Sequence, residues 1–169
     1  MERLIKPLLL VLVGLCMVML AVSLFMPNQV MTSKWVIMAG QKDSIIQEIA
    51  DLHHWKEWNG LLKNAENITY SDSMISWSSA NGRQNKIKLE SISKNGLSTP
   101  ISIADRDFMK SGFSIEKRSV DSVQVVWFLI EDLKWYPWEK FYGMMAAEMK
   151  GPLMQESLDR LKYYMRSKK

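Results

Sequence analysis

Residues Leu8 to Met26 form a run of 19 residues without a charged side chain. As a helix, this run would extend about 28 Å, close to the roughly 30 Å hydrocarbon core of a bilayer. The apolar core of a cleaved secretory signal is usually about 7 to 15 residues long. The run passes that length before Pro27 and Asn28 end it. Residues 1–26 therefore predict an uncleaved membrane anchor, with a cleaved signal as the alternative.

The basic residues beside this run predict its orientation. Arg3 and Lys6 precede it, and only Lys34 follows closely, so the positive-inside rule places the N-terminus in the cytoplasm and the remaining chain outside. Residues 27–33 are expected to form a linker that reaches at most about 25 Å when extended. We therefore expect a single-pass membrane protein whose domain stays close to the bilayer. The lipid bilayer is thus one expected partner.

The remaining residues, 34–169, suit one domain with a substantial core. The net charge of +4 is spread along the chain without a basic block, so nucleic acid is not an expected partner. The single cysteine, Cys16, lies in the apolar run and excludes a disulfide within this domain.

The domain combines strand patterns with helical patterns at both ends. Residues 34–39 predict a strand, and a helix with an apolar face follows through Leu52. Six short alternating segments then predict an antiparallel meander, with strands near 68–70, 74–79, 85–93, 97–104, 112–117 and 122–131. Turns are expected at Asn81-Gly82 and Asn95-Gly96. At the first of these we expect Trp77 opposite Ile87, so that the tryptophan faces inward.

The C-terminal region predicts a long helix with one apolar face. Its stripe recurs at spacings of three and four residues. A helix of this kind needs a surface to cover, and the concave side of the curved sheet is the candidate. The stripe consists of Ala147, Gly151, Met154, Leu158, Leu161 and Met165.

One turn carries a recognisable pattern: Asp51, Leu52, Trp55, Trp58 and Asn59. Together with Ser76-Trp77, Trp127 and the element order, it resembles the START-like superfamily known as SRPBCC, in particular its polyketide cyclase or dehydrase group. The resemblance covers about residues 34–166 and departs from the family where Lys56 and Gly60 replace frequent prolines. It implies an α+β helix-grip fold, in which an antiparallel sheet wraps around a long C-terminal helix, preceded here by one transmembrane helix.

The resemblance also implies an apolar cavity of several hundred Å³ between the sheet and the last helix. A solid core is the alternative. The expected lining is Trp77, Ile87, Leu89, Ile101, Ile103, Phe113, Ile115, Trp127, Leu129, Met154 and Leu158. Aromatic residues near the expected opening of the cavity would form its rim or contact the membrane. The alternative is that they pack the start of the C-terminal helix against the sheet. They are Trp58, Trp135, Trp138, Phe141 and Tyr142.

Three functions remain open. The favoured one is a membrane-anchored binding domain for a lipid or other hydrophobic small molecule. A cyclase or aromatase type of enzyme would need polar groups in the cavity, and Asp105, Tyr70 and Glu116 are the candidates. A structural membrane protein without a ligand is the third. No catalytic residues and no cofactor are expected, and no metal site, because the adjacent His53 and His54 would point about 100° apart on a helix.

Overall fold

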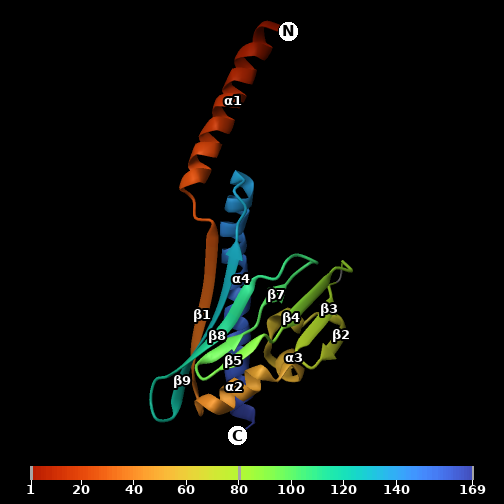
Figure 1. Cartoon of the computed structure of the whole chain (residues 1–169), viewed down its shortest axis with the longest axis vertical. Coiled ribbons are helices and arrows are strands. Elements are labelled where there is room, and N and C mark those ends of the chain that lie inside the picture. The colour runs from red at the N-terminus through yellow and green to blue at the C-terminus, as the bar shows by residue number, and fades with distance from the viewer. Residues whose placement is uncertain (1, 80, 169) are drawn as a thin grey trace.

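A computed structural model of the chain describes residues 2–79 and 81–168, with side chains from residue 7 onward in these ranges. Figure 1 shows the elements. The helices are α1 (Glu2–Phe25), α2 (Lys42–Ala50), α3 (Trp55–Trp58) and α4 (Pro137–Ser167), with 3₁₀ turns η1 (Leu52–His54) and η2 (Gly60–Leu62). The strands are β1 (Gln29–Ala39), β2 (Glu66–Ser71), β3 (Met74–Ser78), β4 (Gln84–Lys88), β5 (Ser91–Ser93), β6 (Gly96–Ser98), β7 (Ile101–Ser102), β8 (Lys110–Lys117) and β9 (Ser122–Asp132).

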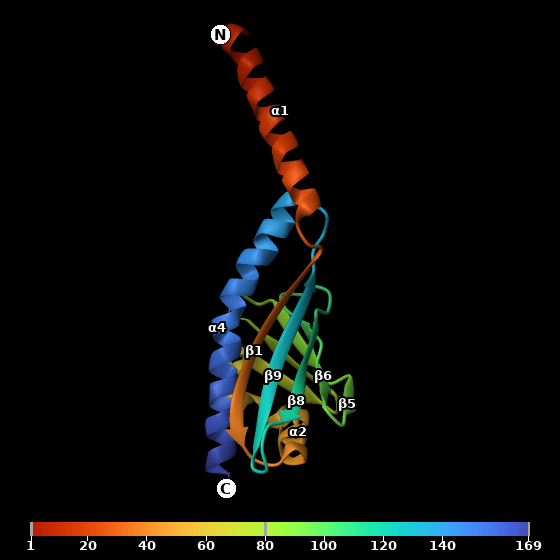
Figure 2. The same cartoon turned by 90° about the vertical axis from the view of Figure 1, so that its left-hand side faces the viewer.

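The strands form two antiparallel sheets that share a concave side. One has the order β1-β9-β8-β6-β5 and the other β2-β3-β4-β7. Helix α4 packs along β1, and the two views in Figures 1 and 2 show it running the length of the domain. The α+β fold class and the antiparallel sheet with a long C-terminal helix are therefore confirmed.

The predicted strands 85–93 and 97–104 are each divided in two, and their halves belong to different sheets. Backbone hydrogen bonds still join them across the division: Lys88 N–H donates to Pro100 O and Glu90 N–H donates to Ser98 O. The register shifts by one residue at this point, from Ile87 opposite Ile101 to Ser91 opposite Ser98. An extra residue on one strand bends a sheet. The two sheets therefore meet at a bend in these strands.

The register predicted for the first hairpin is wrong, although the direction of its tryptophan is correct. Trp77 lies opposite Asn85, not Ile87, and is buried. The loop closes through Ser79 N–H, which donates to Arg83 O, and Gly82 has a φ of 77°, which glycine adopts without strain. The expected and observed registers differ by two residues, and such a difference leaves every side chain on the same face.

Strand β1 begins at Gln29, five residues before the expected start. The expected linker 27–33 is therefore mostly strand, and only Met26 to Asn28 separate α1 from β1. Pairing explains the difference: Gln29 to Ser33 extend the ladder with β9, from Gln29 opposite Asp132 onward. The domain is attached to α1 by three residues.

The predicted apolar stripe of α4 is confirmed. Its members from Gly151 to Leu161 are buried, and Ala147 and Met165 at its ends are half-buried. Pro152 lies inside the helix and has no N–H for the turn before it, which bends helices. Figure 2 shows α4 bent, with its N-terminal half leaning toward the end of α1.

Helix α1 projects away from the sheets (Figure 1). The side chains from Leu8 to Phe25 are exposed, with the exception of the polar Ser23, which is buried. By length and composition, Pro7–Phe25 qualifies as a membrane span or as a signal sequence. The orientation in the membrane was predicted from Arg3 and Lys6, whose side chains lie outside the part of the chain that the structure describes.

Candidate functional site

The interior space between the sheets and α4 is a small apolar cavity. It lies where η2, β7 and β9 face the helix, and its volume is about 30 Å³. Seven apolar side chains and the aliphatic part of Lys150 line it: Leu61, Ile101, Ile103, Trp127, Leu129, Leu153, Met154 and Lys150.

In this conformation the cavity is large enough for a water molecule but too small for a ligand. A water molecule needs roughly 10–15 Å³ on this measure, whereas ligand sites usually span about 300–1,000 Å³. The several hundred Å³ expected from the sequence are not open here. Aromatic rings occupy the space instead, because Phe113 stacks on Trp127 at 5.2 Å and both Trp55 and Trp58 pack edge-on against Phe113.

The expected lining residues divide into two groups. Ile101, Ile103, Trp127, Leu129 and Met154 line the cavity. The others belong to the core around it: Trp77, Ile87, Phe113, Ile115 and Leu158 are buried, and Leu89 is half-buried. Strand alternation identifies inward side chains but not which of them border a gap.

Sequence reasoning missed Leu61, Lys150 and Leu153. Gly60 could have indicated that this segment packs closely against another element. A Cβ at position 60 would lie only 2.8 Å from Leu153 Cδ1 of α4. Gly60 N–H donates to Ser157 Oγ at 2.9 Å, and Ser157 Oγ donates to Leu153 O at 2.7 Å. The small size of Gly60 thus allows η2 to pack against α4, where Leu61 forms one wall of the cavity.

The turn that carries the family resemblance has structural roles. Asp51 accepts the His53 N–H and begins η1, and Asn59 accepts the Leu61 N–H and begins η2. Trp55 is buried and donates its indole N–H to Ile49 O at 2.7 Å. Trp58 was expected at the cavity rim, and this is wrong. Its side chain is 0% exposed, because α3 directs it into the core toward Phe113.

A surface groove of about 580 Å³ adjoins the cavity. The loop Asp105–Met109, residues 131–134 and the start of α4, including Tyr142, line this groove. Lys150, which lines the cavity, forms an ion pair with Glu131 of the groove at 2.5 Å and approaches Met109 Sδ at 4.0 Å. Lys150 therefore connects the cavity lining to the groove, and Tyr142, expected at the cavity rim, lines the groove.

The other expected rim residues lie outside the cavity lining. Trp135, Trp138 and Phe141 are exposed at the start of α4, near the end of α1. Trp135 packs on Tyr136 at 4.8 Å, and Tyr136 stacks on Trp138 at 5.2 Å. They do not pack the helix start into the sheet, which was the alternative.

The three candidate acid or base residues do not converge. Asp105 is exposed and accepts the Gln84 N–H, and Glu116 is exposed on β8. Tyr70 is half-buried and stacks on His53 at 4.9 Å. Burial and the negative charge of Glu57 raise the pKa of the Tyr70 phenol. None of the three lines the cavity.

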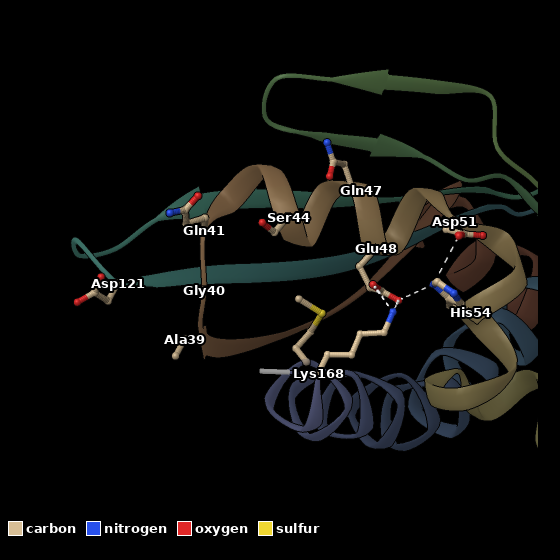
Figure 3. A pocket seen from close by; sticks show the side chains of 11 residues that line it. Ala39, Gly40, Gln41, Ser44, Gln47, Glu48, Asp51, His54, Asp121 and Lys168 are labelled. Carbon is tan, nitrogen blue, oxygen red and sulfur yellow. Dashed lines mark hydrogen bonds and ion pairs between the residues drawn. The ribbon is translucent and has the colours of Figure 1, made fainter.

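A second groove of about 700 Å³, to which polar and ionic side chains contribute, lies at the far end of the domain, between α2, the β8–β9 turn and the C-terminal end of α4. Figure 3 shows its ionic contacts. Lys168 Nζ donates to both Glu48 carboxylate oxygens at 3.2 and 2.9 Å. His54 Nδ1 lies 2.8 Å from Glu48 Oε1, but is not aligned for a hydrogen bond. These contacts tie α4 to α2.

The histidines have separate partners: His53 faces Tyr70 and Asp51, and His54 faces Glu48 and Asp51. Within residues 2–79 and 81–168, no group of three or more His, Cys, Asp or Glu side chains is arranged to hold a metal ion.

Asp51 makes stability in this region depend on pH. Burial raises the pKa of its carboxyl, but the His53 N–H that donates to it and the nearby His54 outweigh burial, so the pKa lies below its ordinary 3.8. The ionised form therefore contributes stability that is present above about pH 3.8 and is lost as the pH falls through the lower folded-state value.

We expect Asp51→Asn to remove this component, so that urea unfolding followed between about pH 2 and pH 6 shows a smaller loss of stability on acidification. Asp72→Asn, in the exposed turn between β2 and β3, is the control. An unchanged pH profile in Asp51→Asn would contradict the assignment.

Comparison with known proteins supports the architecture. No protein-family model and no curated protein matches the sequence. A START superfamily protein from Mycobacterium smegmatis is similar with a TM-score of 0.60 and 18% identity, covering 82% of this chain and 99% of its own. Truncated norcoclaurine synthase from Thalictrum flavum is similar with a TM-score of 0.59 and 12% identity, covering 79% and 92%. A conserved protein from Geobacillus kaustophilus has a TM-score of 0.61 at 6% identity, covering 82% and 96%. The chain has the START-like helix-grip fold.

Proposed function

We propose that this protein is a membrane-anchored binding domain for a lipid or other hydrophobic small molecule, held between the sheet and α4. The observation that carries the proposal is the interior cavity, whose lining is apolar apart from Lys150. Apolar walls with few polar groups are typical of sites for hydrophobic ligands. Lys150 would meet the polar end of such a ligand at the cavity mouth.

The cavity must widen to admit a ligand, and its surroundings support this step. Lys150 of the cavity lining forms an ion pair with Glu131 of the groove beside the cavity and approaches Met109 of that groove. Lys150 precedes Gly151 and Pro152, where α4 lacks a backbone hydrogen-bond donor and where helices deform at low cost. Separation of the ion pair with a small movement of α4 would join the groove to the cavity.

Helix α1 supports the membrane-anchored part of the proposal. Its length and composition suit a single span, and its N-terminal Arg3 and Lys6 favour a cytoplasmic N-terminus with the domain outside. The domain begins three residues after α1. Such an attachment suits local uptake or presentation of a ligand at the bilayer surface more than transfer between distant membranes.

An enzymatic function has less support. Proton transfer needs an acid or base within reach of the bound substrate. Tyr70 and Glu116 lie outside both the cavity and the groove, and Asp105 lies in the groove, exposed to solvent and accepting the Gln84 N–H. One structural neighbour is a synthase, but a fold hosts many activities, and the site decides between them.

Photo-crosslinking tests the site directly. The full chain in lipid nanodiscs is mixed with a fatty acid that carries a diazirine in its tail, irradiated, and mapped by mass spectrometry. We expect crosslinks at Met154, Leu129 and Leu61. Ile103→Trp should lower their yield about tenfold, because overfilling a packed site costs about 1–3 kcal/mol.

Ile92→Trp is the matched control, since it makes the same substitution at an exposed residue of β5. Its crosslinking at the cavity residues should equal that of the unmodified chain. Crosslinks confined to α1 would contradict the proposed ligand site and favour a structural role without a ligand.

A further inference from the structure

The N-terminal half of α4 exposes an apolar stripe to solvent. Its members recur at helical spacings of three and four residues, with Trp138 68% and Met149 77% exposed. The opposite side of the same helix is buried, at Lys140, Gly143 and Ala146. We refer to this surface as the proximal stripe: Trp138, Phe141, Tyr142, Met145 and Met149.

Exposed apolar surface that is continuous over several helical turns marks an interaction site more often than chance exposure. Met145 and Met149 extend the stripe two turns beyond the aromatic residues. Packing within this domain does not account for them, because both side chains are largely exposed. The stripe therefore indicates a contact with an extended apolar surface outside this domain.

The stripe is held in a fixed position relative to α1. Ser23 Oγ donates to Trp135 O at 3.0 Å, and Leu133 N–H donates to Asn28 O at 2.7 Å. Lys140 Nζ is buried and donates to Ser23 O at 2.7 Å and Met26 O at 2.9 Å. Figures 1 and 2 both place the start of α4 beside the end of α1.

We propose that the proximal stripe lies in the interfacial layer of the phospholipid bilayer that α1 crosses. The inference rests on the proposed membrane anchor and adds a second, peripheral contact. Trp135 accepts a hydrogen bond from Ser23 near the end of the span, and Tyr136 and Trp138 pack in series next to Trp135. This position corresponds to the membrane–water interface, where Trp and Tyr are enriched in membrane proteins. Interfacial helices present Trp, Phe and other large apolar side chains to the acyl chains in the same way.

The geometry allows the whole stripe to reach this layer. Figure 2 shows α1 and the N-terminal half of α4 leaning to the same side from their junction. Membrane spans tilt by about 0–40° from the bilayer normal. A tilt of the N-terminal end of α1 away from that side, within this range, turns the outer face of the N-terminal half of α4 toward the bilayer surface. Beyond the bend at Pro152, the rest of α4 continues with the sheets into the aqueous phase.

Site-specific fluorescence tests this placement in the full chain, reconstituted into phosphatidylcholine vesicles. An environment-sensitive NBD label on the native Cys16 reports insertion of α1. In a Cys16→Ser background, Met145→Cys and Met149→Cys report the proximal stripe. Tyr163→Cys is the matched control, because Tyr163 is equally exposed and lies five turns after Met145 on the same face of α4.

We expect labels at 16, 145 and 149 to emit at shorter wavelength and to be quenched by spin-labelled phosphatidylcholine. The label at 163 should emit as in water and resist quenching. Water-like emission at 145 and 149, with quenching at 16, would overturn the interfacial contact while leaving the anchor intact. Water-like emission at 16 would overturn the anchor and this inference together. A blue-shifted label at 145 that lipid spin labels do not quench would assign the stripe to a second copy of the chain and overturn the proposal.

Discussion

Replacing Trp58 with alanine should lower the free energy of unfolding by about 3–5 kcal/mol, the usual cost of removing a large aromatic side chain from a core. Trp58 is fully buried, with its ring 5.0 Å from Trp55 and 6.2 Å from Phe113 between centroids. It joins the turn after α2 to the sheet. Urea unfolding of the full chain in detergent micelles, followed by far-ultraviolet circular dichroism, measures the change.

Two further variants make this result specific. Trp138→Ala is the same substitution at an exposed tryptophan and should change stability by less than about 0.5 kcal/mol. Trp58→Phe should cost less than Trp58→Ala, because the Trp58 indole N–H has no hydrogen-bond partner within residues 2–79 and 81–168. If Trp58→Ala and Trp138→Ala lowered the free energy of unfolding equally, Trp58 would not be a core residue. The position at the cavity rim that was predicted from the sequence would then be supported.

Replacing Lys140 with methionine should loosen the junction between α1 and the domain. The Lys140 side chain is 4% exposed, and its ammonium group donates to two carbonyls at the C-terminal end of α1. Hydrogen bonds to a charged group contribute about 1.5–3 kcal/mol each, and a cation at a helix C-terminus also complements the helix dipole. Methionine keeps the length of the side chain but supplies no donor.

Pulsed electron resonance between spin labels on Cys16 and on Glu116→Cys, an exposed position of β8, measures this junction. We expect a narrow distance distribution in the unmodified junction and a clearly broader one in Lys140→Met. Lys134→Met, at an exposed lysine of the same connection, should leave the distribution narrow. Equal widths in the two methionine variants would show that Lys140 does not fix α1.

Much of the fold follows from local patterns. The alternation through Lys86, Ile87 and Lys88 identifies a strand with one buried face, and its burial agrees. The recurrence from Gly151 to Leu161 identifies the buried face of α4. These predictions succeed because a side chain's direction within a strand or helix depends on its position in a period of 2 or 3.6 residues.

The candidate site was less predictable. Ile101 and Met154 face inward as expected, but the remaining volume depends on how Phe113 stacks on Trp127 and how closely Gly60 approaches Leu153. These contacts join segments far apart in the chain. The residual space between packed side chains is a small difference between large volumes, so periodicity identifies the walls of a cavity without its size.

Local sequence patterns account for the apolar N-terminal segment, the strand and helix periodicities and the α+β order of the domain, because each depends on neighbours within a few residues. Tertiary contacts establish that Trp58 belongs to the core, that the cavity measures about 30 Å³ and that Lys140 holds the end of α1, 117 residues earlier. These features arise where distant segments compete for the same space and the same hydrogen-bond acceptors, and no local pattern records the outcome of that competition.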